Sequence, residues 1–202
     1  MPLPPALPVV RAWIGLGANL GDARQALRSA FAELAALPAS RWVARSSLYR
    51  SAPVDAPGAD YVNAVALIET SLDAQRLLHA LQAIEARHGR QRPQRNAPRT
   101  LDLDLLLYGD ATLATPALTV PHPRLHRRAF VLVPMAEIGA RLGEAVAVPG
   151  HGPVAALLAG VAGQRVDRLD EGSRHRFSSS GLPSRCRSRQ RKASPPPVVC
   201  RE

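Results

Sequence analysis

Lysine is almost absent from this sequence. Lys192 is the only lysine among 26 basic residues, and it lies close to the C-terminus. The common phosphate-binding loop of nucleotide-binding proteins needs a lysine directly after its glycines. A phosphate group bound by the body of this chain must therefore be met by arginine, by backbone amides or by a metal ion.

Cysteine and long apolar runs are also scarce. Cys186 and Cys200 are the only cysteines, both near the C-terminus, so we expect neither a disulfide nor thiol chemistry in the folded part. No apolar run reaches the length of a membrane span. The N-terminal residues Met1 to Pro5 lack the charged start and apolar core of a signal peptide. We therefore expect a soluble, cytoplasmic protein with no membrane partner.

The net charge of +10 comes mainly from the end of the chain. Residues 171–202 carry eight basic and two acidic side chains, which leaves +4 for residues 1–170. From about Glu171 the sequence is rich in Ser, Arg and Pro without apolar periodicity, which predicts a disordered tail after a domain of residues 1–170. The mildly basic body has only 4% aromatic residues for base stacking, so no nucleic-acid partner is expected.

The order of the predicted elements indicates an α+β fold. Two helices are expected after the capping residues Asp22 and Asp73, and they end at Pro38 and Gly89. Strands are expected over residues 9–16, 41–49 and 61–70, around Asp102 and Asp104, and over 118–120, with later helices over 127–138 and 153–161. This β-α-β-β-α-β order predicts a ferredoxin-like sandwich: a mainly antiparallel sheet with helices on one face and the active site on the other.

The segment Arg99-Thr100-Leu101-Asp102-Leu103-Asp104-Leu105 is the most informative stretch. Successive strand side chains alternate between faces, so Leu101, Leu103, Leu105 and Leu107 are expected on one face, and Asp102 and Asp104 on the other. The two aspartate Cα atoms would lie about 6.5–7 Å apart. Carboxylates at this spacing can converge on one or two divalent cations, and hard oxygen ligands without His or Cys favour Mg²⁺ over zinc. Two solvated acids remain the simpler alternative.

A loop with four arginines leads directly into this acidic strand. Its arginines are Arg90, Arg92, Arg95 and Arg99, and Pro93 and Pro98 restrict its backbone. A guanidinium offers bidentate donors to phosphate oxygens and stays charged at any physiological pH. A solvated charged loop is the common alternative, but its position beside two metal-binding acids indicates a polyphosphate substrate.

Three further residues could contact a heterocyclic substrate or a nucleotide. Tyr61 and Asn63 share one face of their strand, where a ring can stack and an amide can offer a donor and an acceptor together. A cross-strand aromatic pair is the structural alternative. His122 precedes a proline, so its backbone is restricted to extended conformations and its side chain has a defined direction.

These segments resemble one enzyme family, 6-hydroxymethyl-7,8-dihydropterin pyrophosphokinase. The resemblance covers about Trp13 to Ile138, and its most specific part is Pro98-Arg99-Thr100-Leu101-Asp102-Leu103-Asp104 followed by Leu118-Thr119-Val120-Pro121-His122. The other matching segments, in family order, are Gly17–Gly21, Ser47–Arg50, Asp60–Ala64, Gln82–Glu85, Gly89–Arg92 and Arg128–Pro134. The resemblance implies transfer of the terminal diphosphate of ATP to the pterin hydroxymethyl group, with release of AMP, in folate biosynthesis.

The resemblance also implies a role for each site residue. Asp102 and Asp104 would bind two Mg²⁺ ions that bridge the ATP phosphates, and Arg90, Arg92 and Arg99 would be the catalytic arginines. The implied ATP-binding residues are Gln82, Glu85, Arg90, Arg92, Arg95, Arg99, Leu105, His122 and Arg128. The implied pterin-binding residues are Ser51, Ala52, Val54, Tyr61, Asn63 and Phe130, with the pterin ring between Tyr61 and Phe130. The enzyme is expected to be a monomer.

The chain departs from the family pattern at a few positions. Asn96 replaces a common tryptophan after the loop arginine, and Pro123 replaces a frequent tyrosine beside His122. None of these departures removes an expected metal ligand or catalytic arginine. Two other functions remain open from the residues alone: a two-metal phosphoesterase or nuclease, and an RNA-binding module driven by the Arg-rich segments.

Overall fold

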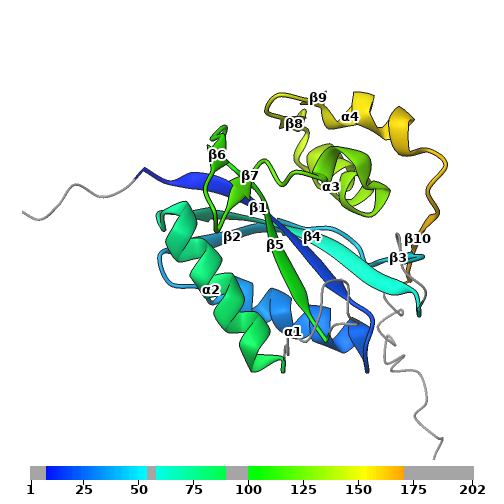
Figure 1. Ribbon diagram of the computed structural model, residues 1–202, viewed down its shortest axis with the longest axis horizontal. Coiled ribbons are helices and arrows are strands. Elements are labelled where there is room, and N and C mark those ends of the chain that lie inside the picture. Colours follow the sequence, from blue (N-terminus) through cyan, green and yellow to red (C-terminus); the bar gives the residue numbers. More distant parts are fainter. Residues whose placement is uncertain (1–7, 54–57, 90–99, 171–202) are drawn as a thin grey trace, which may run out of the picture. The chain divides into compact units, whose positions relative to one another are not determined.

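The structure, a computed structural model, describes residues 8–53, 58–89 and 100–170. These residues form a mixed α/β arrangement built on a mainly antiparallel sheet (Figure 1). The strands are β1 (Val10–Ala18), β2 (Ser40–Arg45), β3 (Tyr49–Ser51), β4 (Tyr61–Thr70), β5 (Asp102–Tyr108), β6 (Leu113–Ala114), β7 (Thr119–Val120), β8 (Ala147–Val148), β9 (Gly152–Pro153) and β10 (Val166–Arg168). The helices are α1 (Ala23–Ala35), α2 (Ala74–Arg87), α3 (Ala129–Leu142) and α4 (Val154–Leu157), with short 3₁₀ turns at Leu125–Arg127 and Leu158–Val161.

The main sheet has six strands. Its order is β10-β3-β4-β1-β5, and β2 pairs with β4 further along the same edge as β3. All of these pairings are antiparallel. β1 is a central strand of the sheet, because it pairs with β4 on one side and with β5 on the other.

Both predicted helix caps are confirmed. Asp22 Oδ1 accepts a hydrogen bond from the backbone N–H of Gln25 at 3.0 Å, and Asp73 Oδ1 accepts one from the N–H of Arg76 at 2.8 Å. Each cap satisfies one of the N–H groups that the first turn of a helix leaves without a partner. The apolar stripes of both helices then pack on the sheet through Leu27, Phe31, Leu77, Leu81 and Ile84.

The expectation that all helices lie on one face of the sheet is wrong. α1 and α2 cover the face that carries Ile14, Leu16 and Leu105. The opposite face carries Trp13 and Leu67, and α3 packs there together with α4. Figure 1 shows α3 and α4 on the side of the sheet away from α1 and α2. The physical reason is that β1 and β4 are apolar on both faces over part of their length, so a second helical layer is needed to bury that surface.

The predicted face of Leu107 is also wrong, because a bulge interrupts β5. Trp13 lies opposite Leu107 and Ile14 lies opposite Leu105, so Leu106 is an extra residue in the register. An extra residue shifts the alternation of every later side chain by one position. Leu101, Leu103 and Leu105 face α1 and α2 as expected, whereas Leu107 joins the α3 face.

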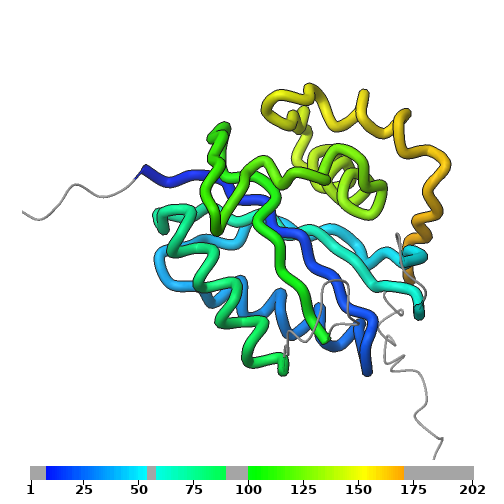
Figure 2. The backbone as a smooth tube through the Cα atoms, viewed as in Figure 1, coloured from blue at the N-terminus to red at the C-terminus, as the bar shows by residue number. Residues whose placement is uncertain are grey.

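The sequence patterns missed several short strands. The strand expected over 41–49 is broken into β2 and β3. Of the strands in the hairpins β6–β7 and β8–β9, only β7 was predicted. After α4 the chain returns to the sheet, where β10 pairs with β3 and Asp167 lies opposite Arg50. Figure 2 follows this return of the backbone to the strand beside β3. Among the described residues, no helix is long and apolar enough to cross a membrane.

Replacing Asp73 with alanine is expected to destabilise the fold by about 1 kcal/mol, because α2 loses its N-terminal cap. The melting temperature should fall by roughly 2–4 °C for a chain of this size. Asp73→Asn is the matched control: it keeps the capping oxygen but loses the exposed ion pair with Arg76, which spans 3.3 Å and contributes little. Thermal unfolding in which both variants lose equal stability would contradict the capping role.

Candidate active site

Three neighbouring strands place one residue each in a row across the sheet. Gly17 of β1 lies opposite Asn63 of β4 on one side and opposite Asp102 of β5 on the other. One step along β1, Gly15 lies opposite Asp104. Residues directly opposite in antiparallel strands point to the same face. Asn63, Asp102 and Asp104 therefore share the face that carries no side chain at Gly15 and Gly17.

Within the described ranges, the structure leaves room above Gly17. A methyl group added at Gly17 would meet, among the described residues, only Asn63 Oδ1, at 3.4 Å. Asp102 and Asp104 are half-buried, and the leucines that flank them are buried on the other face. The predicted alternation of acids and leucines is thus confirmed for residues 101–105. The two carboxylates share a face with Gly17, whereas the Leu106 side chain covers Gly15, where an added methyl group would meet it at 3.3 Å.

The donor set fits a hard divalent cation. Asp102 and Asp104 are two residues apart on one face, and both offer carboxylate oxygens. Within the described ranges, no group of three or more His, Cys, Asp and Glu side chains is arranged to hold a metal ion. A cation bound by these two aspartates would therefore complete its shell with water or substrate oxygens, which is the usual habit of Mg²⁺.

Glu85 holds the acidic strand from its outer side. It is only 2% exposed, and its Oε1 accepts a hydrogen bond of 2.7 Å from the backbone N–H of Leu103, between the two aspartates. β5 is the edge strand of the sheet, so this N–H has no neighbouring strand to bond. A carboxylate on α2 supplies a charge-assisted acceptor instead. Glu85, which the family resemblance places among the ATP-binding residues, thus supports the strand that carries the acids.

A pocket of about 250 Å³ opens beyond the edge of β5. Its lining includes Asp104 and Leu105 of β5, Leu78 of α2, and His122 with Pro123. The segment from Thr115 to Thr119 also lines it. The expected nucleotide-binding residues Leu105 and His122 are therefore brought together beside Asp104. Gln82 is exposed on α2, one helical turn beyond Leu78.

Two hydrogen bonds to backbone groups hold His122, one through its own N–H and one through its ring. Its N–H donates to the carbonyl of Leu106 at 2.9 Å, and its Nδ1 accepts from the N–H of Arg124 at 3.3 Å. Burial, together with the positive charges of Arg128 and Arg124, lowers the pKa of His122 to about 4, against the opposite effect of Asp102. A neutral ring with an occupied Nδ1 carries its proton on Nε2. His122 is therefore assigned as a neutral hydrogen-bond donor at the pocket.

The other end of the row carries Asn63 and Ser51. Asn63 is buried, and its side-chain amide donates to Ser51 Oγ at 2.9 Å. Ser51 of β3 lies opposite Tyr61 of β4, so these three predicted residues are neighbours. Tyr61 is half-buried, whereas Ala52, also predicted here, is exposed. The hydrogen bond to Ser51 fixes the direction of the Asn63 amide beside Gly17.

Phe130 and Arg128 lie at the start of α3, the helix that packs on β4 and β3. The guanidinium of Arg128 lies 5.3 Å from the centre of the Phe130 ring, which is a cation–π distance. Phe130 is half-buried and packs at the margin of the core on this face. The structure thus places both residues on the same side of the sheet as Asn63. The remaining predicted site residues, Val54, Arg90, Arg92, Arg95 and Arg99, lie outside the described residues, as does Asn96.

The sequence matches a known family over most of this region. Residues 13–140 match the model of the family described as 7,8-dihydro-6-hydroxymethylpterin-pyrophosphokinase (HPPK). The chain belongs to this family. The HPPK match includes every described residue of the row, the pocket and the N-terminal part of α3.

Several curated relatives share substantial identity with the chain. A protein of Synechocystis is 46% identical over 125 residues, which cover 62% of this chain and 64% of the relative. One from Haemophilus influenzae is 44% identical over 137 residues, covering 66% of this chain and 84% of the relative. One from Pseudomonas putida is 48% identical over 117 residues, covering 58% and 98%. Each is named 2-amino-4-hydroxy-6-hydroxymethyldihydropteridine pyrophosphokinase.

Solved structures support the fold. The A437G variant of the HPPK-DHPS protein of Plasmodium falciparum superposes on 76% of this chain with a TM-score of 0.57 at 13% identity. The superposed part is 45% of that longer chain. A crystal structure of the wild-type HPPK-DHPS protein gives a TM-score of 0.53 at 12% identity, over 78% of this chain and 42% of that one. The chain therefore spans less than half of the length of these structural relatives and about two thirds of the Synechocystis protein.

Sequence reasoning missed two features of the site. It did not connect Gly15 and Gly17 with the acids, although two glycines in alternate positions of an apolar strand indicate a close approach or a cleared face. It also did not foresee that Glu85 supports β5. That contact depends on how α2 packs on the sheet edge, and no local pattern reveals it.

The stability of the protein is expected to fall as the pH is lowered from about 7 to about 4, in part because of His122. The unfolded chain protonates this imidazole near its ordinary pKa of about 6.5, whereas the folded protein does so only near 4. Between these values the unfolded state binds more protons, so lower pH favours unfolding.

His122→Gln, which cannot take up a proton, should flatten this pH dependence of the urea midpoint. The ring resonances of His122 in the wild type, followed by NMR without metal, should titrate near pH 4. Titration near 6.5 would contradict the assignment of a neutral, buried donor.

Proposed function

We propose that this chain transfers the diphosphate group of ATP to the hydroxymethyl group of 6-hydroxymethyl-7,8-dihydropterin, releasing AMP, in folate biosynthesis. The observation that carries the proposal is the row of Asn63, Gly17 and Asp102. It sets an amide for a heterocycle and a carboxylate for a metal on either side of an open floor. Family membership over residues 13–140 agrees with this chemistry.

In this proposal the two acids hold two Mg²⁺ ions. Bound there, the ions would neutralise the charge that develops on the phosphate oxygens. Asp102 and Asp104 direct their carboxylates to the face above Gly17 and Gly15. Water and the phosphate oxygens of ATP would supply the other ligands.

The nucleotide enters from the pocket beside β5. Leu105 and Leu78 offer apolar surface for the base, and His122 offers its Nε2 proton to an oxygen of the nucleotide. Gln82, Glu85 and Arg128 complete the proposed ATP side among the described residues. Arg90, Arg92, Arg95 and Arg99 are proposed as the phosphate-binding arginines, with Arg90, Arg92 and Arg99 acting in the transfer, because the body of the chain has no lysine for this task.

The pterin binds at the other end of the row. Asn63 presents its amide to the edge of the pterin ring, and Tyr61 and Phe130 offer rings on either side. Ser51, Ala52 and Val54 are assigned to the same slot.

The hydroxymethyl oxygen attacks the β-phosphorus of ATP, the bond from that phosphorus to the α–β bridging oxygen breaks, AMP leaves, and the hydroxyl proton passes to solvent. Positioning and charge neutralisation are enough for this step, and no side chain is assigned as an essential general base.

Several broader features accompany the proposal. The strand order β2/β3-β4-β1-β5 with two helices on one face supports a ferredoxin-like core. Residues 1–170 form the pyrophosphokinase domain, and residues 171–202 form a tail without a part in the reaction. The enzyme is proposed to act as a monomer. Its donor, ATP, is consistent with action in the cytoplasm.

The direct test is AMP formation from ATP and Mg²⁺, with and without 6-hydroxymethyl-7,8-dihydropterin. We expect AMP only when the pterin is present, together with one pterin diphosphate for each AMP. Release of phosphate or nucleotide without the pterin would indicate a two-metal phosphoesterase instead. Salt-sensitive RNA binding that disappears with residues 171–202, without pterin-dependent AMP, would indicate an RNA-binding module.

Replacing Asp102 or Asp104 with asparagine should lower kcat by roughly three orders of magnitude, about 4 kcal/mol, because the metal ligands are lost. The melting temperature without metal should stay close to that of the wild type, since asparagine keeps the size of the side chain and one of its two oxygens. Asp110→Asn is the matched control, because Asp110 is exposed in the turn just after β5. Near-normal turnover in either variant would show that the metal assignment is wrong.

A further inference from the structure

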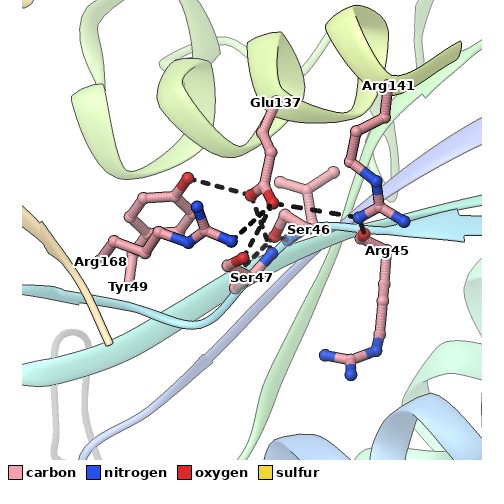
Figure 3. Close-up of polar contacts among 8 residues, drawn as sticks. Arg45, Ser46, Ser47, Tyr49, Glu137, Arg141 and Arg168 are labelled. Atoms are coloured by element: carbon pink, nitrogen blue, oxygen red, sulfur yellow. Dashed lines mark hydrogen bonds and ion pairs between the residues drawn. The ribbon is translucent and has the colours of Figure 1, made fainter. Parts of the chain in front are cut away.

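Glu137 of α3 forms the centre of a polar cluster with Ser47 and Tyr49. Its Oε2 accepts hydrogen bonds from the backbone N–H of Ser47 at 2.8 Å and from the hydroxyl of Tyr49 at 2.9 Å. Its Oε1 accepts one from Ser47 Oγ at 2.8 Å. Figure 3 shows the carboxylate pointing from the helix to this segment at the start of β3. One side chain thus connects α3 with the chain between β2 and β3.

The negative charge of Glu137 is compensated by two arginines. Arg141, one turn further along α3, lies 3.9 Å from Oε1, and Arg168 of β10 lies 3.8 Å from it. Arg141 also donates to the carbonyl of Arg45 at 2.6 Å. The Glu137 side chain is only 16% exposed, so an unbonded carboxylate here would be costly. With its acceptors occupied and its charge matched, the cluster has one well-defined arrangement.

The same segment is also bound to the sheet. Ser46 is 1% exposed, and its hydroxyl donates to the carbonyl of Ser47 at 2.7 Å and accepts from the N–H of Val65 at 3.0 Å. Tyr49 lies opposite Asn63 in the register of β3 and β4. Burial and the neighbouring Glu137 carboxylate raise the pKa of Tyr49 to about 12, so its hydroxyl remains a donor. The position of β3 is therefore fixed by hydrogen bonds to Glu137 of α3 and by pairing with β4.

The two ends of this connection carry substrate-contact residues of the proposed reaction. β3 carries Ser51, which orients the Asn63 amide. α3 carries Phe130, which lies seven residues before Glu137 and so on nearly the same side of the helix. Because α3 and β3 carry these residues, the position of α3 relative to β3 affects the distance between the Phe130 ring and the Asn63–Ser51 pair.

We propose that Glu137 is a positioning residue that sets the width of the pterin slot by holding α3 at a fixed distance from β3. The inference rests on the proposed function, since it assigns the slot to the pterin. It requires that loss of the Glu137 contacts weakens pterin binding more than ATP binding, because Arg128 is the only one of the described ATP-side residues that lies at the start of α3.

The test compares Glu137→Ala with Glu137→Gln. The alanine variant leaves the Ser47 N–H and the Tyr49 hydroxyl without their acceptor, so the KM for the pterin should rise roughly tenfold while the KM for ATP rises clearly less and kcat stays within about a factor of two. The glutamine variant keeps an acceptor oxygen for both donors and can donate to Ser47 Oγ, so it should restore a nearly normal pterin KM. Glu144→Ala, which removes an exposed carboxylate paired with Arg11, is the control and should change neither KM.

Two results would overturn the inference: a pterin KM within a factor of two of the wild type in folded Glu137→Ala, or an equal rise in both KM values. If Glu137→Ala does not fold, Tyr49→Phe removes one donor alone, and a pterin KM unchanged by it would also overturn the inference. Calorimetric titration with the pterin, in the presence of Mg²⁺ and a non-transferable ATP analogue, separates this inference from the proposed function. A wild type that binds the pterin but forms no AMP would disprove the proposed function, while the effect of Glu137→Ala on pterin affinity would still decide the role of Glu137.

Discussion

Strand β5 must present two carboxylates to a ligand on one face while it buries leucines on the other, and the rest of the site depends on this constraint. Leu101, Leu103 and Leu105 anchor the strand on the face covered by α1 and α2. β1 pairs with its inner side, and Glu85 accepts from the Leu103 N–H on its outer side. An edge strand without such a partner would be exposed to water and to foreign strands. Held in this way, Asp102 and Asp104 have fixed positions before any cation or substrate arrives, which is how a preorganised site reduces the reorganisation needed during reaction.

In the proposed reaction, Gly17 of β1 lets two substrates meet on the sheet. Asn63 and Asp102 lie two strand spacings apart, roughly 9–10 Å, with Gly17 between them. Any larger residue at this position would point between the proposed sites of the heterocycle and the phosphate chain. A second helical layer covers the proposed pterin end of the row, because α3 packs over β4 and β3. The proposed nucleotide end lies toward the pocket beside Leu105 and His122. The proposal thus places two binding regions on the sheet, on either side of one residue without a side chain.

Local sequence patterns predicted those features that depend on neighbours along the chain. The caps at Asp22 and Asp73, the strand over residues 61–70 and the alternation of acids and leucines over 101–105 follow from hydrogen-bonding capacity and the two-residue period of a strand. The bulge that turns Leu107 to the other face could not be read from an unbroken run of leucines, because every register buries an apolar side chain. The position of α3, the support by Glu85 and the cluster around Glu137 arise from contacts between distant segments, such as Glu137 with Ser47. Only the packed structure reveals them.

The central claim is that diphosphate transfer takes place over Gly17, between Asn63 and Asp102. The most direct measurement is a crystal structure of the chain with Mg²⁺, the pterin and an ATP analogue that has a methylene group between the α- and β-phosphorus atoms. The account predicts metal ions bound by the carboxylates of Asp102 and Asp104, the pterin edge bonded to the Asn63 amide, and the hydroxymethyl oxygen facing the β-phosphorus above Gly17. Metal ions bound away from these aspartates, or a pterin bound elsewhere on the protein, would contradict it.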